Sequence, residues 1–300
     1  MKILVSGLLN IETTVAVKEF PINYYPIDYP FFGVNSGVGG VGYNIAKALF
    51  VLGDTVELYS FLGNDPEAER IEKALGVIGF DTSHIEKKLK NTPASVVLYD
   101  PSGRRRIYCD LKDIQEQSLS VDTPLSCDIA ALCNINFNRE LIKKAKSEGI
   151  LTATDVHVLS DVDDEYNRDF MENADILFLS DEEIPMAHEL FIRRLYERYH
   201  NQVIVIGMGD QGAMLCDNGK VNHLKVVPCK NIVNTVGAGD ALFSAFLHFY
   251  AKDKDALSSL KKAQIFASKK IAYSDASKGF CTEDEVEQDF SHIHVNIVKK

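Results

Sequence analysis

Short apolar runs alternate with longer amphipathic segments along most of the chain. The runs, rich in β-branched residues, predict strands at Lys2–Ser6, Thr55–Phe61, Ser95–Asp100, Ile129–Cys133, Ile150–Thr154, Ile176–Leu179 and Val203–Gly207. Apolar residues at helical spacing predict helices at Val41–Leu52, Glu67–Ile78, Glu140–Glu148, Glu189–His200 and Ala241–Tyr250. This alternation is typical of an α/β fold, in which a mostly parallel sheet is flanked by helices and binds ligands beyond the carboxyl ends of its strands.

Two segments interrupt the alternation. Residues 13–37 contain three prolines and no helical period, and residues 93–112 predict a hairpin around Pro101-Ser102-Gly103. We expect the two segments to form a small β lid on a single domain that spans residues 1–300. A lid suits chemistry from which water must be excluded.

Charge and composition argue against binding to nucleic acids or anionic membranes and against secretion. The 300 residues carry a formal net charge of −11, so the surface has no overall attraction to nucleic acids or anionic membranes. The N-terminus lacks the pattern of a signal peptide, and the six cysteines are scattered without a CxxC pair. These features predict a cytoplasmic protein with reduced thiols.

A first glycine cluster, Asn-Ser-Gly-Val-Gly-Gly-Val-Gly, precedes the helix predicted from Val41. Glycines let a backbone approach a ligand closely, and Asn44 could donate to and accept from substrate hydroxyls. Gly37, Gly39 and Gly42 also satisfy the GxGxxG spacing of a Rossmann NAD(P)-dependent oxidoreductase. That alternative is weaker, because the glycines do not follow the first strand and Glu57 does not end the second.

A second glycine cluster, Gly237-Ala238-Gly239, leads directly into the apolar helix predicted at Ala241–Tyr250. Small residues at a helix N-terminus leave backbone N–H groups free for an anion, and the helix dipole adds about half a positive charge. Asp240 follows at once, in a position to serve as a general base beside that anion hole. We expect the helix end to keep Asp240 ionised.

The two clusters together resemble the signatures of the pfkB, or ribokinase-like, carbohydrate kinases. Gly39–Gly53 is similar to the N-terminal signature of that family, and Asn234–Asp240 is similar to its C-terminal signature, Asp-Thr-x-Gly-Ala-Gly-Asp. The resemblance spans nearly the whole chain. It implies a ribokinase-like fold and ATP-dependent phosphorylation of a hydroxyl group, usually a primary alcohol of a sugar or a nucleoside, with Mg²⁺ bridging the phosphates.

The resemblance also implies roles for individual residues. Asp240 matches the catalytic base, and the anion hole is matched by Gly237, Ala238 and Gly239. Substrate contacts are matched by Asn10, Glu12, Gly39, Gly40 and Asn44. Nucleotide contacts are matched by Thr235, Gly209, Gly212, Lys278 and Gly279, with the adenine pocket near Ala267–Lys278, and Glu183 matches a residue that binds magnesium through water. A homodimer joined through the lid is implied as well.

Several positions depart from the family pattern. Asn234 replaces an aspartate that helps relatives bind an activating potassium ion, so we expect little stimulation by monovalent cations. Ser180 replaces an asparagine near the magnesium site, and Val41 stands where ribokinases carry a lysine. Glu12 is one methylene longer than the usual aspartate.

Besides the Rossmann oxidoreductase, two functional alternatives and several candidate side chains remain open. A nucleoside remains an alternative phosphoryl acceptor, because the aromatic rings of the segment Phe20–Phe32 could stack on a base. The substitutions at Asn234 and Ser180 leave room for a catalytically silent sugar- or nucleotide-binding regulator. Either Arg104 or Arg106, which would share one face of the hairpin strand, could reach the active site. Asn134, Asn136 and Asp155 lie at predicted strand ends, where they could also face the cleft.

Overall fold

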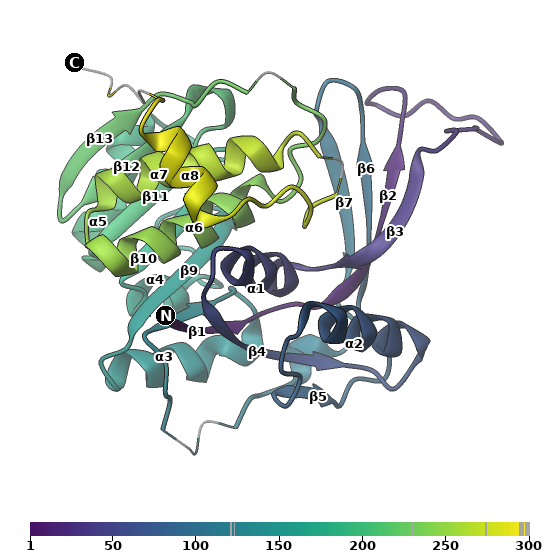
Figure 1. Cartoon of the computed structure of the whole chain (residues 1–300), viewed down its shortest axis with the longest axis horizontal. Coiled ribbons are helices and arrows are strands. Elements are labelled where there is room, and N and C mark those ends of the chain that lie inside the picture. The colour runs from purple at the N-terminus through teal and green to yellow at the C-terminus, as the bar shows by residue number, and fades with distance from the viewer. Residues whose placement is uncertain (121, 123, 230, 274, 294–296, 298–300) are drawn as a thin grey trace.

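A computed structural model describes residues 1–120, 122, 124–229, 231–273, 275–293 and 297 (Figure 1). The strands are β1 Lys2–Ser6, β2 Asn10–Ala16, β3 Val34–Gly39, β4 Thr55–Leu62, β5 Ile85–Lys87, β6 Ala94–Tyr99, β7 Arg105–Asp110, β8 Ile129–Leu132, β9 Leu151–Val158, β10 Ile176–Ser180, β11 Val203–Gly207, β12 Ala213–Asp217 and β13 Lys220–Leu224. The helices are α1 Val41–Val51, α2 Pro66–Ile78, α3 Arg139–Ser147, α4 Arg168–Asn173, α5 His188–Tyr199, α6 Ala238–Asp253, α7 Ala256–Lys270 and α8 Glu283–Phe290.

The large sheet has the order β13-β12-β11-β10-β9-β8-β1-β4-β5 and is parallel from β11 to β5. Helices α1, α6, α7 and α8 pack together over one face, and α3, α4 and α5 contact strands from the other (Figure 1). The chain leaves β1 toward β4 on one side and returns to β8 on the other. Such a change of direction opens a crevice at the carboxyl ends of the strands. The α/β fold predicted from the sequence is therefore confirmed.

A second, four-stranded sheet has the order β3-β2-β6-β7 and projects beside the carboxyl ends of the large sheet (Figure 1). Its strands come from the two segments that interrupt the α/β alternation. The hairpin predicted in residues 93–112 is present as β6 and β7, which pair Leu98 with Arg106 and Tyr99 with Arg105. Strands β2 and β3 were not predicted individually, because their residues lack a clear alternation of apolar and polar side chains.

Close packing holds α1 against the turn between β1 and β2. Gly40, which precedes α1, has φ 99° and ψ 147°, a conformation that is open essentially only to glycine. A Cβ atom at this position would lie 2.3 Å from the carbonyl oxygen of Leu8. Glycine therefore lets the start of α1 approach the end of β1.

Helix α6 fills the space between the sheet and α7, as its apolar sequence predicts. Phe243 and Phe246 are fully buried, and both rings pack on Phe178 of β10 at centroid distances of 5.2 Å. This packing fixes the N-terminus of α6 beneath the second sheet. Within the described residues, no helix is long and apolar enough to cross a membrane.

Candidate active site

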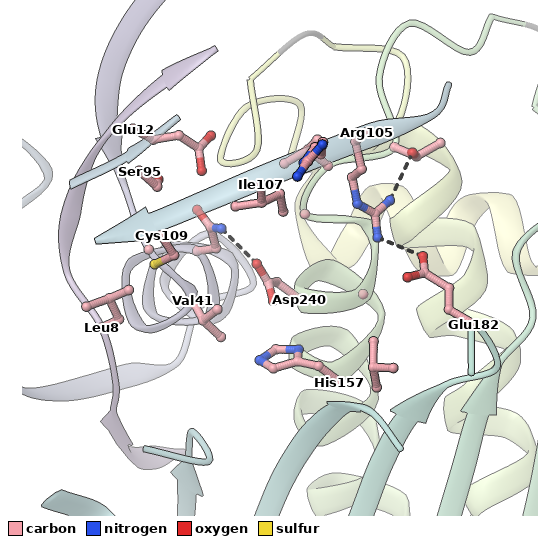
Figure 2. A pocket seen from close by; sticks show the side chains of 18 of the residues that line it. Leu8, Glu12, Val41, Ser95, Arg105, Ile107, Cys109, His157, Glu182 and Asp240 are labelled. Atoms are coloured by element: carbon pink, nitrogen blue, oxygen red, sulfur yellow. Dashed lines mark hydrogen bonds and ion pairs between the residues drawn. The ribbon is translucent and has the colours of Figure 1, made fainter. Parts of the chain in front are cut away.

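A cavity of about 1020 Å³ lies between the carboxyl ends of the large sheet and the four-stranded sheet (Figure 2). Its size exceeds that of a pocket for one drug-sized ligand. The residues that line it are Leu8, Asn10, Glu12, Phe20, Gly40, Val41, Asn44, Ser95, Ser102, Gly103, Arg104, Arg105, Arg106, Ile107, Cys109, Asp155, His157, Val158, Glu182, Thr235, Val236, Gly237, Gly239 and Asp240. Both glycine clusters therefore contribute to one cavity.

Asp240 lies in the first turn of α6, with its carboxyl group at the cavity wall (Figure 2). The side-chain amide of Asn44 donates a hydrogen bond to Oδ2 of Asp240 at 2.7 Å. Burial raises the pKa of Asp240, and Asp155 adds to this, whereas His157, Asn44 and Lys270 act in the opposite direction. Burial therefore acts against the ionised form that the helix end is expected to favour. A carboxylate with a raised pKa is a stronger base.

The turn before α6 is built on glycine. Gly237 has φ 78°, and a Cβ atom there would lie 2.5 Å from the carbonyl oxygen of Ala276. The amide of Ala238 donates to the carbonyl oxygen of Thr235 at 3.1 Å, so this predicted anion-hole donor is already engaged. Gly237 and Gly239 line the cavity, and Ala238 does not.

The part of the cavity next to β2 and the start of α1 carries hydrogen-bond acceptors. Asn10 and Asn44 are buried, and their Oδ1 atoms have no hydrogen-bond partner among the described residues. The amide nitrogen of Asn10 donates to Oγ of Ser95 at 3.0 Å, which leaves its oxygen for a ligand. Burial and the nearby Asp275 and Asp240 raise the pKa of Glu12 to about 7. Buried acceptors without donors indicate a ligand that supplies hydroxyl or amide hydrogens.

Arg105 from β7 crosses the cavity toward the large sheet (Figure 2). Its guanidinium group forms an ion pair with Glu182 at 3.2 Å and donates to Oγ1 of Thr235 at 3.4 Å. Arg104 and Arg106, which the sequence left open as candidates, line the cavity as well. Arg104 pairs with Asp100 at 2.8 Å, whereas Arg105 pairs with Glu182 across the cavity.

Two functional candidates were missed by sequence reasoning. His157 lines the cavity with φ 60°, where β9 shifts register against β10, and its backbone amide donates to Asp155 at 2.8 Å. An extra residue in a strand often re-aims a side chain beside a site. Glu182 reaches the cavity wall, whereas the predicted Glu183 does not. The neighbouring Ser180 accepts a hydrogen bond from the backbone of Glu182 at 3.3 Å.

Other predicted residues lie outside the cavity lining. Gly39 faces Glu12 and Asn10 closely, since a Cβ atom there would lie 2.9 Å from Cβ of Glu12. Asn134 donates to Val156 of β9 and to Asn167, Asn136 donates to the carbonyl oxygen of Gln115, and neither side chain lines the cavity. The predicted nucleotide-side residues Gly209, Gly212, Lys278 and Gly279 follow β11 or lie after α7, and they too are outside the lining.

Comparison with known proteins identifies the class to which this fold and cavity correspond. The sequence pattern of the pfkB family carbohydrate kinases matches residues 1–283, and the chain belongs to this family. It is therefore a phosphotransferase of the carbohydrate kinase type.

Individual relatives agree with that assignment. The deoxyribokinase of Salmonella typhi is 25% identical over 93% of this chain and 94% of its own. A microbiome-derived acarbose kinase has a structure with a TM-score of 0.83 at 20% identity, covering 97% of this chain and 98% of its own. The structure of the nucleoside kinase of Methanocaldococcus jannaschii has a TM-score of 0.80 at 19% identity, covering 97% of this chain and 98% of its own. These two structures support the ribokinase-like fold.

Proposed function

We propose that the protein transfers the γ-phosphoryl group of ATP to a primary hydroxyl group of a sugar or related polyol. The observation that carries this proposal is the group of acceptors at one end of the cavity, formed by Glu12 and the unpartnered oxygens of Asn10 and Asn44. A polyol supplies several hydroxyl hydrogens to such a group at once. Asp240 stands at the same cavity wall, beside the turn that would hold the phosphoryl group.

Asp240 acts as the general base in this proposal. The hydrogen bond from Asn44 occupies Oδ2, which fixes the carboxyl group and leaves Oδ1 free to accept a proton. The acceptor oxygen attacks the γ-phosphorus, its proton passes to Asp240, and the bond from the γ-phosphorus to the bridging oxygen breaks to release ADP. In a loose transition state the proton leaves late, so positioning matters more than base strength.

The phosphate groups are held by backbone donors and one cationic side chain. Gly237 and Gly239 contribute N–H groups beside the positive end of the α6 dipole, and Arg105 reaches the same region from the second sheet. Once the γ-phosphate enters, Arg105 can exchange its pair with Glu182 for the phosphate oxygens. The second sheet thereby acts as the lid.

Magnesium would neutralise the ATP phosphates when bound. The residues fit a site in which phosphates and water supply most ligands, because Asp155 and Glu182 offer carboxylates at the cavity wall and Glu183 follows directly. Thr235, Gly209, Gly212, Lys278 and Gly279 are proposed to contact the nucleotide, as the family pattern implies. With Asn234 in place of an aspartate, potassium is not expected to stimulate turnover. The proposed location of the reaction is the cytoplasm.

The acceptor class is tested by an ATP-consumption screen over pentoses, hexoses, larger saccharides and nucleosides. We expect turnover with a saccharide or polyol, because among the described residues of segment 20–32 only the ring of Phe20 lines the cavity and the other aromatic side chains of that segment are exposed. Turnover with nucleosides and with no saccharide would show that the acceptor is a nucleoside and not a sugar. Ligand binding without ATP turnover on any compound would favour the silent regulator.

Replacing Asp240 by asparagine should lower turnover at least about a hundredfold, which is the usual contribution of a general base. Binding of ADP and of the acceptor, measured by calorimetry, should change less than about threefold. Asp253→Asn serves as the matched control, since Asp253 lies at the other end of α6 and outside the cavity lining. Near-wild-type turnover of Asp240→Asn would exclude Asp240 as the base.

The raised pKa of Glu12 predicts that binding of the acceptor depends on pH. Its pKa is raised to about 7, so Glu12 is ionised at pH 8 and protonated at pH 6. The ionised form accepts the stronger hydrogen bond, so the KM for the acceptor should rise roughly fivefold as the pH falls from 8 to 6. Glu12→Gln should abolish this step. A KM that is flat over this range in the unmodified protein would contradict the role of Glu12.

We also propose a homodimer joined through the lid sheet. The segment before β3 exposes large apolar side chains, among them Tyr24 at 89%, Phe31 at 85% and Phe32 at 101% exposure. Light scattering should give roughly twice the chain mass of 33.4 kDa. A change of Phe31 and Phe32 to aspartate should return the protein to one chain. A monomeric unmodified protein at micromolar concentration would refute the dimer.

A further inference from the structure

Lys270, the last residue of α7, is fully buried, with 0% exposure. Its ammonium group donates a hydrogen bond to the carbonyl oxygen of Val236, the residue directly before Gly237. Lys270 does not line the cavity and has no role in the proposed chemistry so far. A buried lysine is costly unless its charge is compensated, so this position requires an explanation.

The loop in front of α6 is fastened to the end of α7 at several points. The amides of Val233 and Asn234 both donate to the carbonyl oxygen of Ile271, at 2.9 Å and 3.2 Å. The amide of Val236 donates to Oδ1 of Asn234 at 2.9 Å. The loop thus joins Lys270 to the cavity, because Val236 and Gly237 line the cavity while Lys270, which does not, binds the carbonyl oxygen of Val236.

The charged groups that face Lys270 come from four different parts of the chain. Asp240 of α6, Asp275 after α7 and Glu12 of β2 favour its charged form, and Arg105 of β7 opposes it. Burial has the larger effect and lowers the pKa of Lys270 to about 8. At neutral pH, one enclosed ammonium group thus faces three carboxyl groups and the site where a phosphoryl group would arrive.

We propose that Lys270 is a built-in cation behind the phosphoryl-binding turn. Its ammonium group holds the Val236 carbonyl, which sets the position of the Gly237 turn, and it offsets the negative charge that Asp240 and the transferred phosphoryl group bring together. Lys270 acts through Val236 and through its charge, so it is a positioning residue. This inference rests on the proposed phosphotransfer. A fixed cation here also leaves a monovalent ion from solution with little to add.

The first test compares Lys270→Met with Lys269→Met, using the best acceptor from the screen. Lys269 lies in the same helical turn and pairs with Asp289 at 2.8 Å, outside the cavity lining. Lys270→Met should lower kcat about thirtyfold to a hundredfold, somewhat less than the loss of a direct oxyanion donor. Because Lys270 lowers the pKa of Glu12, the KM for the acceptor should rise by no more than the roughly fivefold change expected from protonation of Glu12, and Lys269→Met should match the unmodified protein.

The pH profile separates a charge effect from a merely structural one. Lys270 lowers the pKa of Asp240, so removing the ammonium group should raise that pKa and move the acid limb of kcat/KM to higher pH. In the unmodified protein, turnover should fall as the pH rises through about 8, where Lys270 loses its proton. Lys270→Arg keeps the charge, so its alkaline limb should move to higher pH.

Each outcome decides the proposal. An equal kcat for Lys270→Met and the unmodified protein would overturn it, and so would an unmodified profile that stays flat from pH 7 to 9.5. If Lys270→Met fails to melt cooperatively, the profiles of Lys270→Arg and of the unmodified protein decide alone. An unmodified protein that phosphorylates no acceptor would instead refute the proposed function itself, and this inference with it. Stimulation of the unmodified protein by potassium over a bulky organic cation would also count against a built-in cation.

Discussion

The hydrogen bond between Asn44 and Asp240 joins two parts of the chain that are 196 residues apart. It connects the start of α1, which follows the first glycine cluster, to the start of α6, which follows the second. Neither helix forms a site alone, because the acceptors for hydroxyl groups lie near α1 and the phosphoryl-binding turn lies at α6. Every chemical step in the proposed reaction depends on this distance being held. The packing of α1 against α6 and the close approach at Gly40 hold it.

Charge is distributed around this junction in a way that suits a reaction between anions. Carboxyl groups of Glu12, Asp155 and Asp240 surround the cavity, and burial raises the pKa of two of them. Positive charge is supplied from three directions, by Arg105 from the lid sheet, by the N-terminus of α6 and by Lys270 behind the turn. The positive groups sit where phosphate would bind. The acceptors sit where hydroxyl groups would bind.

Much of the fold could be predicted, because strands that are buried on both faces of a sheet leave continuous apolar runs in the sequence. Strand β1 and strand β11 match their predicted bounds, and α1 and α2 differ by one residue at one end. Strands β2 and β3 could not be predicted individually, since β3 holds Gly37 and Gly39 and is largely exposed. Both glycine clusters pointed to the cavity, because glycine is needed wherever the backbone must turn or approach closely.

Other site residues leave no signal in the sequence. Arg105 could not be told from its neighbours, because the choice depends on where the turn ends and β7 begins. His157 depends on a register shift between two strands, which no local pattern encodes. Lys270 follows Lys269 in an ordinary basic helix end, yet one is buried and the other is paired near the surface. These assignments require the tertiary structure, since burial alone distinguishes chemically identical residues.

A protein with a net charge of −11 can bind a substrate as anionic as ATP, because surface charges and the groups at the cavity act over different distances. Surface charges are screened by salt within about 8–10 Å, so the acidic surface governs encounters with large polyanions and has little effect inside a cavity. At the cavity, uncharged N–H groups and Arg105, together with the enclosed Lys270 nearby, act at short range and low dielectric, where each electrostatic interaction is stronger than in water. An acidic protein of this design can therefore repel nucleic acid polymers and still bind a nucleotide. In the proposed role of Lys270, its burial has the same effect, because an ammonium group shielded from solvent acts on the phosphoryl-binding turn with little screening by salt.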